Sequence, residues 1–302
     1  MKIFVVIVTY NPAKWIDKCF SSLRTSTVPI NSIVIDNCSK DGSQEIIKTK
    51  YPEVDLVLSE KNLGFGKANN IGIKKAYDSG ADYVLLLNQD AWIESNTIEK
   101  LVEYHQNNID FDIISPIHLD GSGNNLDYNF STYINATDCK NLISDIYMSQ
   151  IKSKLYEAKF VNAAAWLMTR KCIETVGGFN PLFYHYGEDN NYIDRLHFHG
   201  LKIGICPISK IYHDREQTNK SVFFEKGELS KRGKLLKYLN PINPNYIDSE
   251  ISILTRNTFY FIATLRFKKA INSFKEKKRL KHFSIEAKDN IRLCSRKGPT
   301  FL

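Results

Sequence analysis

The sequence contains no apolar run long enough to cross a membrane. Its longest strongly apolar runs are residues 3–8 and 83–87, whereas a spanning helix needs about 20 residues. No small-residue cleavage site follows the first run, so that run is not predicted to be a signal peptide. We therefore expect neither a transmembrane helix nor a secretory leader.

Cysteines are few and scattered. The six cysteines show no CxxC spacing, which argues against a zinc site and against a disulfide framework. Reduced thiols in a cytoplasmic protein are the expectation. With 302 residues, 43% of them hydrophobic and 25% charged, the composition is that of an ordinary globular protein. The chain is long enough for one large α/β domain or two small ones.

A glycine-rich phosphate loop is missing from the place where a dinucleotide-binding fold would have it. Thr9, Tyr10, Asn11 and Pro12 directly follow the first apolar run, whereas a Rossmann fold has GxGxxG there. A nicotinamide-dependent dehydrogenase is therefore disfavoured. A sugar-phosphate nucleotidyltransferase, the nearest enzymatic alternative, would be expected to carry a Gly-rich loop with Arg or Lys at the same point.

Strand and helix patterns alternate along the first 110 residues. Short buried strands separated by helices predict a parallel sheet that is covered on both faces. Ligands of such sheets bind beyond the carboxyl ends of the strands, so residues 9–11, 36–41 and 88–90 are expected to converge. The predicted strands are 3–9, 33–36, 54–59 and 83–88, and the predicted helices are 13–24, 42–50, 66–79 and 95–106.

Positive charge is concentrated at the carboxyl end of the chain. The formal net charge is +8, yet residues 256–302 alone hold 13 basic and 3 acidic residues. In residues 264–281, apolar positions recur at helical spacing among eight Lys and Arg, the pattern of a basic amphipathic helix on an anionic bilayer. A solvated helix face and a purely anion-binding, non-enzymatic protein are the alternatives. Nucleic acid is disfavoured because no recognition module is visible.

Polar residues stand where the predicted strands end. Asp36 closes a buried strand, which is costly unless its carboxylate finds partners, and Asp41 fits the cap of the following helix. Asp90, two residues after the fourth strand, is the type of ligand that holds a hard divalent cation together with substrate phosphates. Residues 64–66 read either as a tight turn before a helix or as a loop against a nucleotide.

Taken together, these segments resemble the family 2 inverting glycosyltransferases of the GT-A fold, especially the rhamnosyltransferase-like branch. The resemblance covers roughly residues 3–215 and rests on the order and spacing of short motifs. These are Val8-Thr9-Tyr10-Asn11, Asp36-Asn37 with Ser39 and Asp41-Gly42, Asn62-Leu63-Gly64-Phe65-Gly66 with Ala68-Asn69-Asn70, Leu87-Asn88-Gln89-Asp90, Gly177-Gly178-Phe179-Asn180, Glu188-Asp189 and His213.

The resemblance implies a fold and a division of the chain. The fold is α/β, a nucleotide-diphospho-sugar transferase fold with a mostly parallel central sheet flanked by helices. The GT-A domain is expected at residues 1–245, with a nucleotide-binding half at about 1–118 and an acceptor half at about 119–245. A basic helical extension is expected at residues 246–302.

The resemblance also implies how the donor is held. The donor-binding residues would be Thr9, Tyr10, Asn11, Asp36, Asn37, Gly66, Asn69, Asn88 and Asp90. Asp90 matches the last carboxylate of the family's DxD metal motif, whereas Asn88 replaces the first acid and would weaken cation binding. His213 matches a family histidine near the metal and the diphosphate, although a lone histidine is more often structural. The implied cofactor is Mg²⁺ or Mn²⁺ held by Asp90 and His213.

The resemblance assigns the catalytic base to Asp189, with Trp166 and Glu188 on the acceptor side. The alternative for Glu188 and Asp189 is that they are first-turn acids favoured by a helix dipole. Asn191 stands where the family often has another acid. The implied reaction is inverting transfer of a sugar, with rhamnose favoured, from a nucleotide diphosphate to a saccharide or a lipid-linked saccharide in bacterial surface polysaccharide synthesis. The enzyme would work in the cytoplasm, at the inner face of the membrane.

Overall fold

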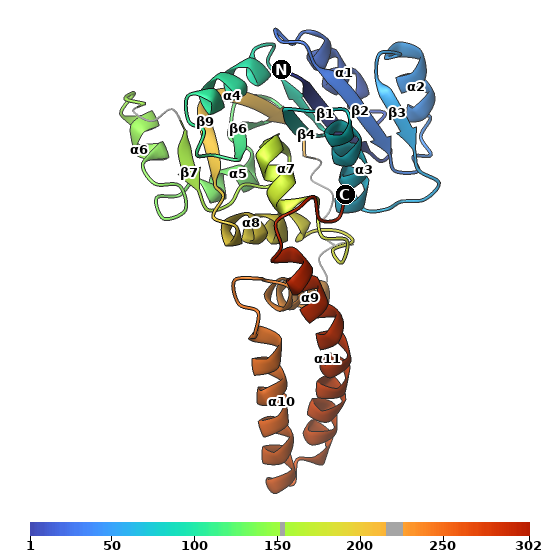
Figure 1. The fold of residues 1–302 in the computed structure, drawn as a ribbon, viewed down its shortest axis with the longest axis vertical. Helices are drawn as coiled ribbons and strands as arrows, with labels where there is room; N and C mark the ends of the chain where they lie inside the picture. The colour runs from blue at the N-terminus through green and yellow to red at the C-terminus, as the bar shows by residue number, and fades with distance from the viewer. Residues whose placement is uncertain (152–154, 216–225) are drawn as a thin grey trace. The chain divides into compact units, whose positions relative to one another are not determined.

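In the computed structural model the chain forms two compact units, and the structure describes residues 1–151, 155–215 and 226–302. The first unit comprises Met1–Asn219 together with Gly298–Leu302, and the second comprises Lys220–Lys297. Figure 1 shows the sheet of the first unit and the long helices of the second.

The first unit is built on a nine-stranded sheet. Its strand order is β3-β2-β1-β4-β8-β6-β9-β5, and β7 pairs with β9. The strands are β1 (Ile3–Thr9), β2 (Asn31–Asp36), β3 (Asp55–Leu58), β4 (Tyr83–Asn88), β5 (Ala91–Ile93), β6 (Ile113–Asp120), β7 (Tyr156–Ala158), β8 (Ala165–Thr169) and β9 (Ile203–His213).

The first four strands are all parallel, with β1 between β2 and β4. Six of the seven residues of β1 are buried, as expected for a β-branched run that is covered on both faces. Helices α1 (Ile16–Arg24), α2 (Ser43–Lys50) and α3 (Phe65–Asp78) follow the first three strands, and α4 (Thr97–Gln106) follows β5. The predicted α/β fold class is confirmed, and the boundaries of these first elements lie within a few residues of the prediction.

The other half of the sheet is mixed. β8 lies antiparallel between β4 and β6, while β5 and β7 pair antiparallel with β9. β6 and β9 are parallel, with a register shift between Pro116 and Ile117. The sheet is therefore parallel in its first half and mixed in its second. The helices of this half are α5 (Tyr128–Tyr133), α6 (Leu142–Tyr147), α7 (Arg170–Val176) and α8 (Glu188–Phe198).

Each face of the sheet has its own hydrophobic core. Because successive side chains of a strand point to opposite faces, Val6 belongs to one core and Val5 and Ile7 to the other. Helices α1 and α4 cover the face of Val5, and helices α3, α7 and α8 cover the face of Val6. The carboxyl ends of the strands emerge between these two layers, which leaves one edge of the sheet for a site.

The second unit is helical, with α9 (Lys226–Tyr238), α10 (Tyr246–Ala263) and α11 (Phe267–Cys294). Figure 1 shows α10 and α11 as a hairpin of two adjacent helices, and an ion pair of 2.8 Å joins Lys288 Nζ to Asp248 Oδ1 across it. The Tyr238 ring of α9 lies 5.9 Å from that of Tyr246. Among the helices of the described ranges, none combines the length and the apolar character that a bilayer crossing requires.

Candidate active site

The carboxyl ends of β1, β2 and β4 bring the predicted donor-binding segments together. Thr9 is in register with Asp36 on β2, and Val8 is in register with Asn88 on β4. The backbone N–H of Tyr10 donates to Gln89 Oε1 at 2.6 Å. The expected convergence of residues 9–11, 36–41 and 88–90 is confirmed.

Asp36 is fully buried, and its carboxylate accepts four hydrogen bonds from its own chain. Thr9 Oγ1 donates to Oδ2 at 3.0 Å, and the hydroxyl of Ser39 donates to the same oxygen. The backbone N–H of Ser39 and the amide of Gln44 donate to Oδ1 at 3.0 and 2.6 Å. These bonds offset the cost of burying the carboxylate, so Asp36 fixes the loops after β1 and β2. Its contact with a nucleotide stays a prediction.

The loop after β1 is tied to the loop after β2. The N–H of Asn11 donates to Ser39 Oγ at 2.9 Å, and Asn11 Oδ1 accepts from the N–H of Lys40 at 2.7 Å. Asp41 accepts from the N–H of Ala13 and from that of Ser43 in the first turn of α2, so it joins the two loops as well as the helix. Tyr10 keeps 48% of its surface exposed beside them. The pair of loops is thus rigid, with an aromatic ring available to a ligand.

The glycine loop after β3 packs against the chain that precedes α8. Gly64 has φ +81°, and a Cβ there would lie 2.1 Å from the carbonyl oxygen of Tyr184. A Cβ on Gly66 would lie 3.0 Å from Phe179 Cβ. Both glycines are therefore needed for the turn and for close packing. Asn37 reaches the same loop, since its Oδ1 accepts from the N–H of Leu63 at 2.7 Å.

Asn69, the remaining predicted donor residue of this region, is buried in α3. Its Nδ2 donates to the carbonyl of Phe65 at 3.0 Å. That bond lies within the first turns of the helix. Direct contact of Gly66 or Asn69 with a donor stays a prediction.

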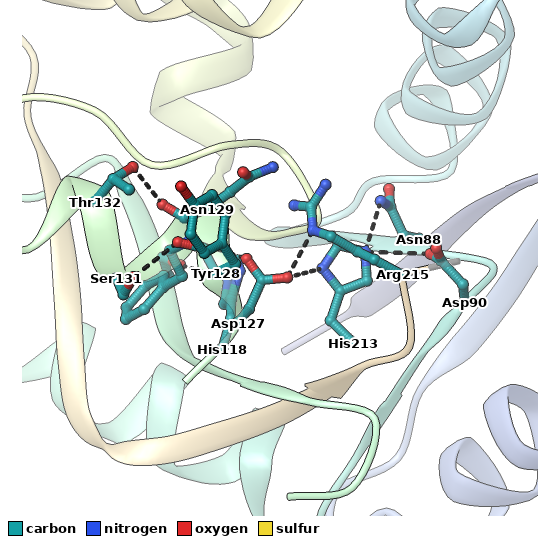
Figure 2. Close-up of polar contacts among 12 residues, drawn as sticks. Asn88, Asp90, His118, Asp127, Tyr128, Asn129, Ser131, Thr132, His213 and Arg215 are labelled. Atoms are coloured by element: carbon teal, nitrogen blue, oxygen red, sulfur yellow. Dashed lines mark hydrogen bonds and ion pairs between the residues drawn. The ribbon is translucent and has the colours of Figure 1, made fainter. Parts of the chain in front are cut away.

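A row of charged side chains centres on His213, at the end of β9 (Figure 2). His213 Nε2 lies 3.3 Å from Asp90 Oδ1 and 3.4 Å from the amide nitrogen of Asn88. On the other side of the ring, Nδ1 lies 3.5 Å from Asp127 Oδ2, which also accepts from Arg215 Nε at 2.6 Å. The register of β9 explains the meeting, because His213 pairs with Ala91 on β5 and with Asp120 on β6.

The row is electrostatically coupled. Burial would lower the pKa of His213, but its contacts with Asp127 and Asp90 outweigh burial and raise that pKa above its ordinary value. Burial would likewise raise the pKa of Asp127, but its close contact with His213 and its hydrogen bonds from the N–H of Phe130 and from Arg215 hold that pKa below its ordinary value. Asp127 is therefore a buried anion that fixes His213 from behind.

Asp90 and His213 present two donors suited to a divalent cation. Their Oδ1 and Nε2 atoms are 3.3 Å apart, close to the separation of about 3 Å between neighbouring ligands of an octahedral Mg²⁺ site. Asp127 at Nδ1 supplies the carboxylate that usually orients a metal-binding histidine. No group of three or more His, Cys, Asp or Glu able to hold a metal occurs in the described part of the chain, so phosphates and water would have to complete the coordination.

Asp189, the predicted base, is the second residue of α8 and is partly buried. Burial raises the pKa of Asp189, and the positive charge of Arg215 opposes that rise. Burial raises the pKa of Tyr133 to about 12, with the charges of Asp189 and Asp127 adding to the effect. Arg215 and Tyr133 thus interact electrostatically with Asp189, and both also interact with Asp127. That Asp189 and the proposed metal ligands line one site stays a prediction.

The comparisons with known proteins identify the family. A model of glycosyl transferase family 2 matches residues 4–177, more than half of the chain. The chain belongs to glycosyl transferase family 2. The nucleotidyltransferase and the non-enzymatic anion-binding alternatives are therefore set aside, and the prediction of a glycosyltransferase is confirmed.

Similar proteins include two rhamnosyltransferases. The chain is 24% identical, over 70% of its length and 75% of theirs, to the N-acetylglucosaminyl-diphospho-decaprenol L-rhamnosyltransferase of Mycobacterium tuberculosis. It is 27% identical to the dTDP-rhamnosyl transferase RfbF of Shigella flexneri, over 70% of this chain and 68% of that one.

Solved structures support the GT-A fold. S. aureus TarS 1–349 in complex with UDP-GlcNAc matches with a TM-score of 0.58 at 17% identity, over 98% of this chain and 90% of that one. GalNAc-T7 with UDP, GalNAc and Mn²⁺ matches with a TM-score of 0.55 at 16% identity, over 71% of this chain and 44% of that one. At these identities the likeness concerns the fold alone.

The segment before Asp189 in this glycosyltransferase is supported from within the first unit. Asn70 of α3 brackets Phe179, accepting from its N–H at 2.7 Å and donating to its carbonyl at 2.8 Å. The amide of Asn70 also donates to the carbonyl of Phe301 at 3.2 Å, and the N–H of Gly178 donates to the carbonyl of Thr300 at 2.7 Å. Residues 298–302 therefore help to hold the turn that leads to α8.

Trp166 does not lie on an acceptor surface. It is fully buried, its indole N–H donates to the carbonyl of Val161 at 3.2 Å, and its ring packs against Phe179 and Tyr192. An enclosed ring cannot contact an acceptor, so the prediction for Trp166 is corrected to a core role beneath α8. Glu188 is buried too, and its acceptor contact stays a prediction.

Two members of the charged row, Asp127 and Arg215, were missed from the sequence. Asp127 is the N-cap of α5, with Oδ1 accepting from the N–H of Phe130 at 2.9 Å. Aspartate is one of the preferred N-cap residues, so a helix start could have been considered there. No local pattern predicted that its second oxygen, Oδ2, contacts Arg215 and His213.

Proposed function

We propose that the chain transfers a sugar, with inversion, from a nucleotide-diphosphate donor to a hydroxyl of a saccharide or lipid-linked saccharide. Rhamnose is the favoured sugar because the similar proteins include rhamnosyltransferases, and bacterial surface polysaccharide is the favoured product. The observation that carries the proposal is the row Asp90, His213, Asp127 and Arg215, whose charge also acts on Asp189.

Asp90 and His213 would hold a Mg²⁺ or Mn²⁺ ion, which when bound would supply positive charge to the leaving diphosphate. Asp127 would keep His213 Nε2 turned toward Asp90. Thr9, Tyr10, Asn11 and the other predicted donor residues would seat the base and the ribose at the ends of β1 and β2, where the loops are already fixed by Asp36. Preorganised charge of this kind needs no reorganisation during the reaction.

Asp189 would accept the proton of the acceptor hydroxyl. As the hydroxyl oxygen forms a bond to the anomeric carbon, the bond from that carbon to the diphosphate oxygen breaks on the opposite face, and the electron pair leaves with the diphosphate. The raised pKa of Asp189, caused by burial, makes it a stronger base than a solvated aspartate. A single displacement of this kind needs no nucleophilic residue and gives inversion.

Asp189→Asn tests the base. We expect donor affinity, measured by isothermal titration with a dTDP- or UDP-sugar and Mn²⁺, to stay unchanged, and turnover to fall by about 10²- to 10⁴-fold. The matched control is Asp194→Asn, which removes another acid of α8 whose pKa burial raises to about 6. Turnover of Asp189→Asn equal to that of the control would exclude Asp189 as the base.

A thermal-shift screen tests the donor and the metal together. UDP-, dTDP- and GDP-sugars are compared with and without Mn²⁺, since a ligand that binds the folded state raises the midpoint of unfolding. We expect one class of nucleotide to stabilise the protein, more strongly with Mn²⁺, and Asp90→Ala to abolish the metal effect. Identical shifts with and without Mn²⁺ in the wild type would contradict the metal site and leave the transferase proposal standing.

A further inference from the structure

The connection between α10 and α11 exposes a cluster of large apolar side chains. We call residues 259–274 the hairpin end. The most exposed members are Leu265, at 74% of its surface, and Phe259, at 68%. The full set is Phe259, Tyr260, Ile262, Leu265, Phe267, Ile271 and Phe274, each with about half of its surface or more exposed. Such a contiguous apolar group marks an interaction surface.

The same end of the hairpin carries only positive charge. No acidic residue stands between Glu250 and Glu276, whereas the interval holds Arg256, Arg266, Lys268, Lys269 and Lys275. In the part of the chain that the structure describes, none of these five forms an ion pair.

Away from the hairpin end, acidic residues stand among the cations of the second unit, and some of the two kinds pair. Lys234 contacts Glu276 at 2.9 Å, and Lys288 contacts Asp248 at 2.8 Å. The hairpin end therefore differs from the rest of the unit in holding cations with no acidic residue near them in the sequence, and these cations lie in the same stretch of chain as the apolar cluster.

The combination selects among partners. A second copy of the chain would bring the same five positive charges against one another, and lysine is depleted from protein interfaces. Nucleic acid would neutralise the charges but would leave seven large apolar side chains without partners. An anionic bilayer satisfies both, because apolar side chains enter the acyl boundary while Lys and Arg extend to the headgroups.

We propose that the hairpin end inserts into the headgroup region of an anionic lipid bilayer and holds the protein there as a peripheral protein. The sequence predicted one basic amphipathic helix over residues 264–281, and the helix boundaries revise that prediction. Helix α11 begins only at Phe267, and Leu265 lies in the left-handed region with φ +57°. The membrane contact is centred on the turn between two helices and does not extend along one helix to residue 281. The proposal does not depend on the transferase reaction.

Flotation of the full chain with vesicles tests the proposal. The vesicles contain phosphatidylcholine with or without about 30% phosphatidylglycerol, an anionic fraction large enough for polybasic attraction. We expect binding to the anionic vesicles, weakening with salt, and little binding to the neutral ones. Arg266→Gln with Lys268→Gln and Lys269→Gln should lower the partition coefficient by about 100-fold.

Matched variants separate the hairpin end from the rest of the helix. Leu265→Ser with Phe267→Ser should weaken binding by about tenfold or more. The apolar control is Ile285→Ser with Leu293→Ser, at exposed positions that start about 27 Å further along α11. The charge control, Lys278→Gln with Arg279→Gln and Lys281→Gln, removes the same number of cations from exposed positions. Both controls should bind nearly as the wild type does.

Three outcomes would overturn the proposal. One is equal loss of binding in the test and control variants, and another is equal binding to neutral and anionic vesicles. The third is sedimentation of the wild type as a dimer that Leu265→Ser with Phe267→Ser converts to a monomer, without vesicle binding. Circular dichroism melting checks that all variants fold, and transfer to a soluble acceptor should be unchanged in the hairpin-end variants.

Discussion

Asp127→Asn is expected to weaken both the fold and the proposed metal site. Asp127 is buried, and its two oxygens have separate tasks. Oδ1 accepts from the N–H of Phe130 and caps α5, while Oδ2 faces Arg215 and His213. Asparagine keeps the shape and the capping oxygen but removes the charge. The substitution therefore isolates the electrostatic role of one side chain.

The size of the effect follows from the exposure of the partners. Removing one member of a buried ion pair costs about 3–5 kcal/mol. His213 is almost completely buried, but Arg215 keeps 35% of its side chain exposed, so water can solvate the cation that is left behind. We expect a loss of about 2–3 kcal/mol in the free energy of unfolding. Asp127→Ala also removes the cap and should cost about 1 kcal/mol more.

Urea denaturation measures the stability of the two variants, and Mn²⁺-dependent binding of the donor measures the site. Loss of the carboxylate that orients a metal-binding histidine costs about 10- to 100-fold in metal affinity, and we expect that loss for both substitutions. Asp110→Asn, an exposed acid, is the control and should change neither quantity. Wild-type stability and wild-type Mn²⁺ dependence in Asp127→Asn would refute the role given to Asp127.

Two further predictions concern Asp189 and Gly64. Burial raises the folded-state pKa of Asp189 above its unfolded value, so the acid limb of the pH–rate profile should lie above about 4. Its ionisation costs stability as pH rises through the folded pKa, so Asp189→Asn should melt above the wild type at pH 8, with the difference vanishing at low pH. A constant difference would contradict this. Gly64→Ala should lower the free energy of unfolding, measured in urea, at least twice as much as Gly80→Ala does. Both glycines have φ +81°, but only Gly64 faces the carbonyl of Tyr184. Equal losses would show that the Tyr184 backbone moves to accommodate the added Cβ.

The parallel half of the sheet was predictable because its strands are local patterns. β1 and β4 are continuous apolar runs whose predicted limits match the structure, and each is bounded by polar residues. β8 is equally buried, with all five residues enclosed. It pairs antiparallel with β4 and β6 through contacts distant in the sequence, and a five-residue apolar run cannot be distinguished from part of a helix by periodicity. The strand pairing of the mixed half therefore could not be predicted from the sequence.

The site shows the same limit at the level of single residues. Asp90 and His213 could be proposed from motif order, although 125 positions separate Asn88 from the histidine it meets. The acid behind the histidine could not, because residues 119–141 hold three aspartates and nothing local shows which of them meets the histidine. Asp120 turns its carboxylate to Ser122 and Asn125, and Asp138 turns its own to Asn135 and Lys159. Asp127 alone of the three meets His213, because its place at the start of α5 directs one oxygen to the helix and leaves the other for the histidine. The start of α5 and the long-range register of β9 together determine which acid orients the histidine, and the composition of the loop does not.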